Sequence, residues 1–203
     1  MSSIFSITLR ITAAISILML SACASRKLPK YETPIPRARF QTVRTTAYTH
    51  SESDHLAYGR KTALGTTLKC GPDIYSAAAD WSRWPAGTIF RICSTGELCQ
   101  VDDYGWALAG RNTIDLYKPS RAAMNAWGVR NERIEILHWG SPWASYKRMQ
   151  PVSKYAHIAR MMKEIRQFYP FQQDPPQIPA PQADPSYVVQ AVPVVGPTRN
   201  ANR

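Results

Sequence analysis

The chain has 203 residues and is strongly basic, with 25 lysines and arginines against 14 acidic residues and a formal net charge of +11. This balance predicts an anionic partner, such as nucleic acid, an anionic glycan, a teichoic-type polymer or lipid headgroups. Only a central stretch of roughly 110 residues has the pattern of a folded core, which excludes an assembly of several large domains.

The first 22 residues predict a secretory signal peptide. Arg10 is their only charged residue, and the apolar run 11–20 is shorter than the roughly 20 residues that a stable membrane-spanning helix needs. Small residues then lead to Cys23. Export excludes nucleic acid as a partner, because an exported protein does not meet the genome.

Residues 20–23, Leu-Ser-Ala-Cys, resemble a bacterial lipobox. The resemblance implies cleavage before Cys23, a diacylglycerol on its sulfur and an acylated amino group, which together anchor a protein stably in a membrane. Ala24, rather than an aspartate, follows the cysteine, which favours the periplasmic face of the outer membrane. The alternative is an ordinary secreted protein in which Cys23 is incidental.

Polar, proline-containing segments flank the central stretch. Residues 23–38 are basic and predict a tether between the lipidated cysteine and the folded domain. Residues 170–203 are rich in Pro, Gln and Ala, and such a composition cannot bury enough apolar surface to offset the entropy of ordering. We therefore expect a disordered or extended tail there; a strap that contacts the cell wall is the alternative.

Residues 39–146 predict a mainly β domain. Its candidate strands are 40–48, 87–93, 98–101, 114–117 and 134–139. The turn residues 94–97 lie between two alternating runs, which is the pattern of a hairpin. One short helix is predicted at 121–127, with Ser120 as its N-cap and Gly128 after its end. Several short strands with one helix indicate a small closed barrel.

The segment 147–169 predicts a C-terminal helix, which we expect to run from Pro151 to Phe168. Apolar residues at near-helical spacing form one face, and lysines and arginines cover the other. We expect this helix to pack on the barrel. A basic surface that contacts lipid or wall polymer is the alternative.

Three cysteines remain after Cys23 in an oxidising compartment. Cys93 and Cys99 flank the predicted hairpin loop and are the disulfide candidates, which would leave Cys70 unpaired. A bridge across so short a loop would contribute ~2–3 kcal/mol. The sequence does not decide among the three pairings that three cysteines allow.

Acidic residues are scarce, and Asp80, Asp103 and Asp115 stand where apolar or turn residues are expected. Asp115 lies between an isoleucine and a leucine, so its carboxyl is expected to be half-buried, and burial raises a carboxyl pKa by disfavouring the charged form. A raised pKa suits a general acid near neutral pH. The alternative is a turn cap that accepts backbone N–H bonds, which the pattern favours for Asp80 and Asp102.

Five groups of residues between Thr46 and Leu137 resemble, in order, the motifs of the three-aspartate (3D) domain, the catalytic barrel of membrane-bound lytic transglycosylases. In chain order these are Thr46-Ala47-Tyr48; Gly59 with Thr62-Ala63-Leu64-Gly65; Ala78-Ala79-Asp80 with Trp84-Pro85-Ala86-Gly87-Thr88; Asp103-Tyr104-Gly105 through Gly110 with Ile114-Asp115-Leu116-Tyr117; and Ala126-Trp127-Gly128 with Ile134-Glu135-Ile136-Leu137. Each group alone is weakly specific, but the five in the family's order are strongly so.

The resemblance implies a six-stranded double-psi β-barrel that acts on peptidoglycan glycan strands as a monomer, without cofactor or metal. It implies cleavage of the β-1,4 bond between N-acetylmuramic acid and N-acetylglucosamine with a 1,6-anhydro product. Asp115 is then the catalytic acid/base, and Asp103 tunes or orients it. The residues expected to contact the glycan are Asp80, Tyr48, Tyr104, Gly105, Trp106 and Gly110.

Three departures from the family's pattern bear on this site, and one of them is Ala109 in place of the usual lysine. Trp106 replaces a glycine, and a tryptophan there either blocks a sugar or offers it a stacking platform. One extra residue separates Gly110 from Asp115, and we expect it to shift Asp115 relative to Asp103.

Two other functions therefore stay open. A non-catalytic module would bind glycan by stacking sugars on aromatic side chains, namely Trp81, Trp84, Trp106, Tyr48 and Tyr104. A site for a hard cation would use the three aspartates as oxygen ligands.

Overall fold

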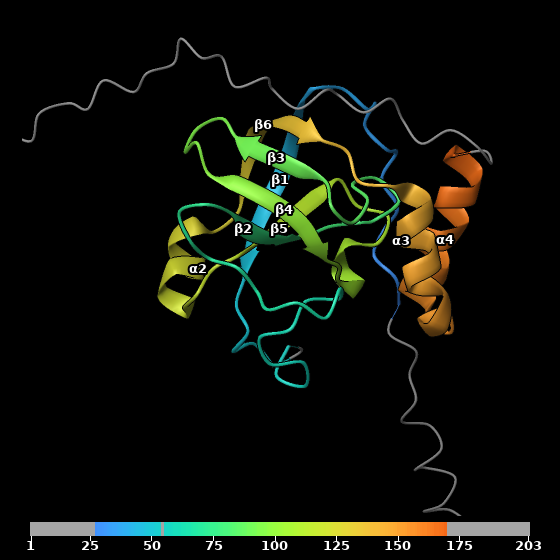
Figure 1. The fold of residues 1–203 in the computed structure, drawn as a ribbon, viewed down its shortest axis with the longest axis horizontal. Coiled ribbons are helices and arrows are strands. Elements are labelled where there is room, and N and C mark those ends of the chain that lie inside the picture. The colour runs from blue at the N-terminus through green and yellow to red at the C-terminus, as the bar shows by residue number, and fades with distance from the viewer. Residues whose placement is uncertain (1–26, 54, 170–203) are drawn as a thin grey trace, which may run out of the picture.

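The computed structural model describes residues 27–53 and 55–169 (Figure 1). Its strands are β1 (Phe40–Tyr48), β2 (Tyr75–Ala78), β3 (Ile89–Ile92), β4 (Leu98–Asp103), β5 (Thr113–Tyr117) and β6 (Arg130–His138), and its helices are η1 (Trp106–Leu108), α2 (Arg121–Trp127), α3 (Pro142–Met149), η2 (Gln150–Val152) and α4 (Ala156–Phe168). The predicted signal peptide, Cys23 and the predicted tail lie outside the described residues. Within the described part, no helix is long and apolar enough to cross a membrane.

The six strands close into one barrel in the order β1-β5-β2-β4-β3-β6. β1 pairs with β5, and β2 with β4, in parallel, whereas the other neighbours are antiparallel. Helix α2 follows β5 directly in the chain. The prediction of a mainly β domain built as a closed six-stranded barrel is confirmed.

Alternation along the strands fills the barrel with apolar side chains. Phe90 and Ile92 of β3 are fully buried, while Arg91 between them is exposed. Ile134 and Ile136 of β6 are buried in the same way. Because successive side chains of a strand point to opposite faces, this alternation decides which residues of each strand face outward.

The segment 28–36 lies against the barrel instead of standing off it as a tether (Figure 1). The Glu32 backbone N–H donates to the Gly110 carbonyl (2.8 Å), and the Glu32 carboxylate accepts the Asn112 N–H (2.6 Å). The same carboxylate pairs with Arg111 (2.6 Å), and Ile35 packs on the core. The tether prediction is therefore wrong for these residues, because Glu32 supplies an acceptor for the turn before β5.

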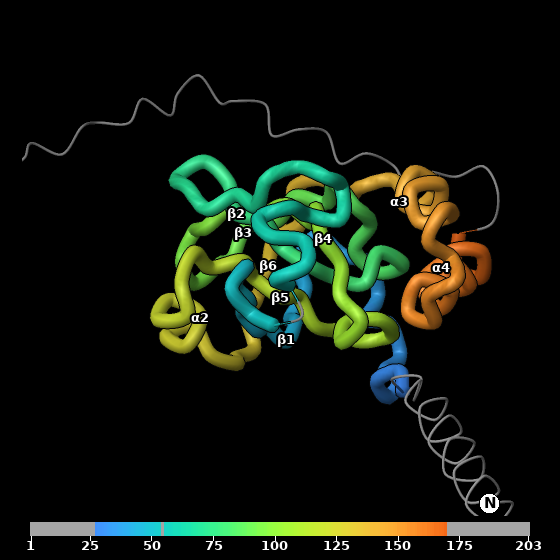
Figure 2. The backbone as a smooth tube through the Cα atoms, turned by 90° about the horizontal axis from the view of Figure 1, so that it is seen from below, coloured from blue at the N-terminus to red at the C-terminus, as the bar shows by residue number. Residues whose placement is uncertain are grey.

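Two helices, α3 and α4, lie side by side next to the barrel (Figure 1, Figure 2). Sequence analysis missed α3, although Ser141 caps it by accepting the Ala144 N–H and Pro142 occupies its first turn.

Helix α4 begins later than predicted. Pro151 lies in the short helix η2, and the α-helix starts only at Ala156. Its apolar face joins the core through Ile158, Met161 and Ile165, so the prediction that the C-terminal helix packs on the barrel is confirmed.

The predicted disulfide between Cys93 and Cys99 is wrong. Cys99 pairs with Phe90 in the β3–β4 register and is buried in the core, whereas Cys93 lies beyond the end of β3 and is exposed. A disulfide needs two Cβ atoms that face each other, which these positions do not provide. Cys70, Cys93 and Cys99 are all free thiols, and burial raises the pKa of Cys99 to about 12.

Candidate functional site

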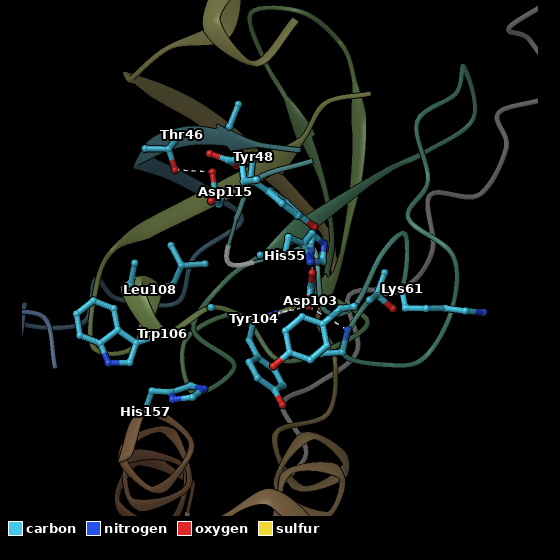
Figure 3. A pocket seen from close by; sticks show the side chains of 18 residues that line it. Thr46, Tyr48, His55, Lys61, Asp103, Tyr104, Trp106, Leu108, Asp115 and His157 are labelled. Carbon is cyan, nitrogen blue, oxygen red and sulfur yellow. Dashed lines mark hydrogen bonds between the residues drawn. The ribbon is translucent and has the colours of Figure 1, made fainter. Parts of the chain in front are cut away.

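A cavity of about 650 Å³ lies against the part of the barrel where β1, β5, β2 and β4 are neighbours (Figure 3). This volume is within the range of ligand sites, roughly 300–1,000 Å³. Residues from these strands, the loop after β1, η1 and α4 line it: Thr46, Ala47, Tyr48, Glu52, His55, Tyr58, Lys61, Thr62, Ala63, Ala78, Asp103, Tyr104, Gly105, Trp106, Ala107, Leu108, Asp115 and His157.

The strand register brings Asp103 and Asp115 to this cavity. Ala78 of β2 pairs with Asp115 on one side and with Asp103 on the other, and Thr46 of β1 pairs with Asp115. Neighbouring strands are ~4.8 Å apart, so the two aspartates stand in one row with their backbones roughly 10 Å apart. A register shift in β2 just before Ala78 brings Asp103, rather than Asp102, into this row.

Asp115 faces the cavity because its chain neighbours fill the barrel. Ile114 and Leu116 are buried in the core, so the side chain between them points to the opposite face. Asp115 is half-buried there, as its apolar neighbours predicted. The Thr46 hydroxyl donates to Asp115 Oδ1 (2.6 Å), which fixes one oxygen of the carboxyl (Figure 3).

Asp103 is buried, and donors engage both of its oxygens. The Tyr48 hydroxyl donates to Oδ2 (3.1 Å), and the N–H groups of Ala63 (3.0 Å) and Tyr104 (2.9 Å) donate to Oδ1. Burial raises the pKa of Asp103 to about 6, although these donors act in the opposite direction. Burial, with the nearby Asp103 carboxyl, raises the pKa of Tyr48 well above its usual value, so its hydroxyl remains a donor.

The aspartates at the end of β4 are expected to make the protein less stable as the pH rises. Burial raises the pKa of both Asp102 and Asp103 from 3.8 to about 6. The folded state then binds these protons more tightly than the unfolded state, so the free energy of unfolding falls between about pH 4 and pH 6. At about 1.4 kcal/mol per pKa unit, the fall from the coupled pair is on the order of 2–4 kcal/mol.

Asp102→Asn is the matched variant, because Asp102 lies outside the cavity lining. Its Oδ2 accepts the Ser76 hydroxyl (2.7 Å), and its Oδ1 has no hydrogen-bond partner, so an amide fits the site. Chemical denaturation of the parent and the variant between about pH 4 and pH 6 separates the contribution of Asp102 to the free energy of unfolding from that of the other acidic residues. Equal pH slopes for the two proteins would contradict the prediction.

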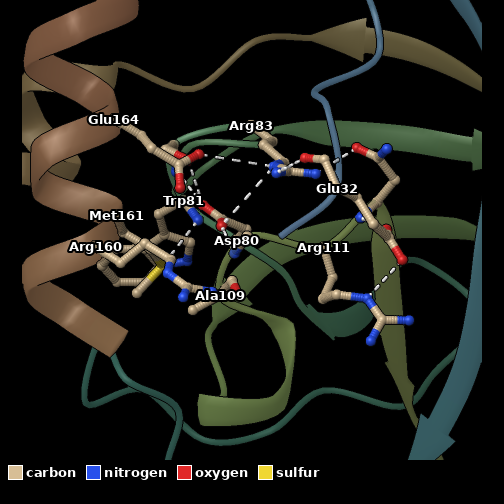
Figure 4. Close-up of polar contacts among 12 residues, drawn as sticks. Glu32, Asp80, Trp81, Arg83, Ala109, Arg111, Arg160, Met161 and Glu164 are labelled. Carbon is tan, nitrogen blue, oxygen red and sulfur yellow. Dashed lines mark hydrogen bonds and ion pairs between the residues drawn. The ribbon is translucent and has the colours of Figure 1, made fainter. Parts of the chain in front are cut away.

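Asp80 lies outside the cavity, in a separate buried network (Figure 4). Gly110 also lies outside the cavity lining and belongs to the same network. Asp80 Oδ1 accepts the N–H (2.8 Å) and the hydroxyl (2.5 Å) of Ser82, and Oδ2 accepts the Gly110 N–H (2.5 Å). Gly110 has a φ of +78°, and a Cβ there would stand 2.9 Å from the Arg160 guanidinium. The structure therefore does not bring Asp80 and Gly110 to the cavity with the other expected glycan contacts, and the turn-cap alternative describes Asp80.

The aromatic residues divide between the core and the cavity. Tyr48, Tyr104 and Trp106 line the cavity, as does Gly105. Trp81 and Trp84 are instead buried in the core, and both indole N–H groups are satisfied there. The interpretation of these last two residues as sugar platforms is wrong.

Sequence analysis missed part of the cavity lining as site residues: Thr46, Glu52, His55, Lys61 and His157. The only feature of the sequence that could have identified Thr46 as a site residue is its place in the first motif. Glu52 and His55 lie in the loop after β1 and show no recognisable spacing, while His157 lies on a helix beyond the last motif.

In residues 27–53 and 55–169, no three His, Cys, Asp or Glu side chains gather in a way that could hold a metal ion. The cation-site alternative needed all three aspartates together. It is wrong because Asp80 accepts from Ser82 and Gly110 in the buried network and does not reach the cavity.

No family model matches the chain. It is similar to the cell wall-binding protein YocH of Bacillus subtilis (strain 168), at 31% identity over 97 residues, which are 48% of this chain and 32% of that protein. It is also similar to the putative cell wall shaping protein YabE of the same organism, at 32% identity over 100 residues, which are 49% of this chain and 23% of that protein. The chain thus spans about a third or less of the length of these curated relatives.

Proposed function

We propose that this protein acts on the peptidoglycan of the cell envelope, as a lytic transglycosylase with Asp115 as its single general acid/base. The observation that carries the proposal is the contrast between the two cavity aspartates. Asp115 lines the cavity and is half-buried there, whereas Asp103 is buried. Two relatives named for the cell wall support the choice of substrate.

The reaction needs only one carboxyl to move protons. Protonated Asp115 gives its proton to the glycosidic oxygen as the bond from C1 of N-acetylmuramic acid to that oxygen breaks. The resulting carboxylate then takes the proton of the C6 hydroxyl of the same sugar as its oxygen attacks C1. The products are a 1,6-anhydro sugar end and a free hydroxyl on N-acetylglucosamine, and Asp115 is protonated again.

An intramolecular nucleophile explains why a second catalytic carboxyl is not required. Ordinary glycosidases use a pair of carboxyls because they must also activate water or form a covalent intermediate. Here the C6 hydroxyl is already tethered to the reacting sugar, and a well-oriented internal group has a very high effective concentration. Asp103 is left with a positioning role, because it holds Tyr48 and the N–H groups of Ala63 and Tyr104 around the cavity.

The test is to incubate the protein with purified sacculi and analyse the released muropeptides by mass spectrometry. Fragments with 1,6-anhydro ends are the expected result. Fragments with reducing ends would indicate hydrolysis by water and would contradict the transglycosylase.

A non-catalytic glycan-binding module is the second candidate. Trp106, which replaces a glycine of the family pattern, lines the cavity, and one relative is named a cell wall-binding protein. This candidate predicts that the protein sediments with sacculi but releases no fragments from them.

We further propose that acylation of Cys23 anchors the protein in the envelope, at the outer membrane. The basis is the run 20–23, Leu-Ser-Ala-Cys, after a short apolar segment. Full-length protein expressed in a bacterium is expected to partition into detergent, and Cys23→Ala into the aqueous phase. The mass of the N-terminal peptide checks the modification; an unmodified Cys23 would contradict it.

A further inference from the structure

Helix α4 supplies one wall of the cavity. His157, in its first turn, lines the cavity together with Tyr104 and Trp106, which come from the segment after β4 (Figure 3). The ring centroids of His157 and Tyr104 are 6.0 Å apart. The cavity is thus not a feature of the barrel alone, because a C-terminal element completes it.

Contacts between α4 and the segments around Trp81 and Ala109 hold this wall in place (Figure 4). The Arg160 guanidinium donates to the Ala109 carbonyl (3.1 Å), and the Met161 sulfur accepts the backbone N–H of Trp81 (3.3 Å). Trp81 in turn packs edge-on against Tyr104, with ring centroids 4.8 Å apart. A wall fixed before the ligand arrives saves the entropy of ordering it on binding.

The chemistry of this wall suits a neutral sugar. Tyr104 and Trp106 offer apolar ring surface with polar edges, and Leu108 adds aliphatic surface. Burial lowers the pKa of His157, so its imidazole is neutral near neutral pH and presents one donor and one acceptor. An N-acetylhexosamine has matching hydroxyl and acetamido groups and an apolar ring face, whereas an anionic ligand would call for a cation at this wall.

From this arrangement we infer that His157, Trp106 and Tyr104 form a subsite for one N-acetylhexosamine unit of a β-1,4-linked glycan, beside the bond on which Asp115 acts. The inference rests on the proposed function for its choice of a glycan ligand. It concerns binding alone and does not require that the bond be cleaved.

Neutral oligomers of β-1,4-linked N-acetylglucosamine are the probe, titrated into the mature chain by calorimetry. His157→Ala and Trp106→Ala are each expected to weaken affinity about tenfold. His157→Gln keeps a donor and an acceptor and is expected to restore most of the affinity. His138→Ala, at a half-buried histidine of β6 outside the cavity lining, is the matched control and should bind like the parent.

Thermal unfolding of each variant separates loss of the subsite from loss of the fold. Parental affinity in folded His157→Ala, or no binding of these oligomers by the parent, would overturn the subsite. Its failure is distinguishable from failure of the proposed function. If His157→Ala binds more weakly and the parent forms no anhydro product, the subsite is supported and the transglycosylase is contradicted. If His157→Ala binds like the parent and the parent forms anhydro product, the transglycosylase is supported and the subsite is contradicted.

Discussion

Replacing Asp115 with asparagine is expected to abolish the release of 1,6-anhydro muropeptides from sacculi while leaving the fold and the binding to sacculi intact. Asparagine keeps the size of the side chain and an oxygen that can accept the Thr46 hydroxyl, which lies 2.6 Å from Oδ1. It cannot carry the proton that both steps need. Positioned proton transfer contributes about 10²–10⁴-fold, and since both steps use the same carboxyl, we expect a loss of about 10⁴-fold.

Asp73→Asn is the matched control for this experiment. Asp73 is exposed and lies outside the cavity lining, so the same loss of charge there should leave the rate of release unchanged. Parental release by Asp115→Asn would remove Asp115 as the acid/base. If neither protein releases fragments and both sediment with sacculi, the glycan-binding module is the better description.

The half-buried position of Asp115 could be predicted from the sequence because strand alternation is local, whereas its catalytic role was implied only by the resemblance to the 3D domain. In a strand, an aspartate between two buried apolar residues must face away from the core, so Ile114 and Leu116 fix the direction of Asp115. The closed barrel was predicted from several short strands with one short helix, and its six strands were implied by the resemblance. Sequence analysis did not identify Thr46 as a site residue, because its contact with Asp115 depends on the pairing of β1 with β5. No run of neighbouring residues specifies that pairing.

The errors concern strand register and contacts that the pattern of neighbouring residues does not specify. Cys93 and Cys99 flank a plausible hairpin loop, but the actual register places Cys99 opposite Phe90. The predicted tether is held by Glu32, whose partners lie some 80 positions further along the chain. The motifs grouped Asp80 with Asp103 and Asp115. Its oxygens instead accept hydrogen bonds from Ser82, in the same turn, and from Gly110.

Asp80→Ala is expected to destabilise the protein by ~3–5 kcal/mol, the range for breaking a buried charged pair. Asp80 is fully buried, and its two oxygens accept from the Ser82 N–H, the Ser82 hydroxyl and the Gly110 N–H. The Arg83 guanidinium lies 3.9 Å from Oδ2. Alanine leaves these donors buried without an acceptor, and each such orphan costs about 1–3 kcal/mol.

The size of the effect follows from what the network joins. Gly110 lies between η1, which lines the cavity, and β5, which carries Asp115, and its carbonyl accepts the Glu32 N–H. The hydroxyl oxygen of Ser82, the other partner of Asp80, also lies 3.0 Å from Glu164 Oε2 of α4. One carboxylate therefore ties the turn before β5 to the segment after β2, and through Ser82 to α4.

Burial and hydrogen bonding act in opposite directions at Asp80, and a graded set of variants separates them. Burial raises the pKa of Asp80, so its charge is costly, while the donors from Ser82 and Gly110 favour that charge. Asp80→Asn removes the charge but turns an amide N–H₂ towards one of these donors, so we expect a loss smaller than that of Asp80→Ala. Asp73→Asn is the control for loss of a charge alone, because Asp73 is exposed.

Thermal and chemical unfolding measure the series. For a domain of this size, ~3–5 kcal/mol corresponds to a fall in Tm of about 10–15 °C, and Asp73→Asn should change Tm by no more than a few degrees. If Asp80→Ala were as stable as the parent but no longer bound sacculi, Asp80 would be a glycan contact after all. A large fall in Tm, with sacculus binding retained below the transition, would establish it as the acceptor that holds the turn before β5.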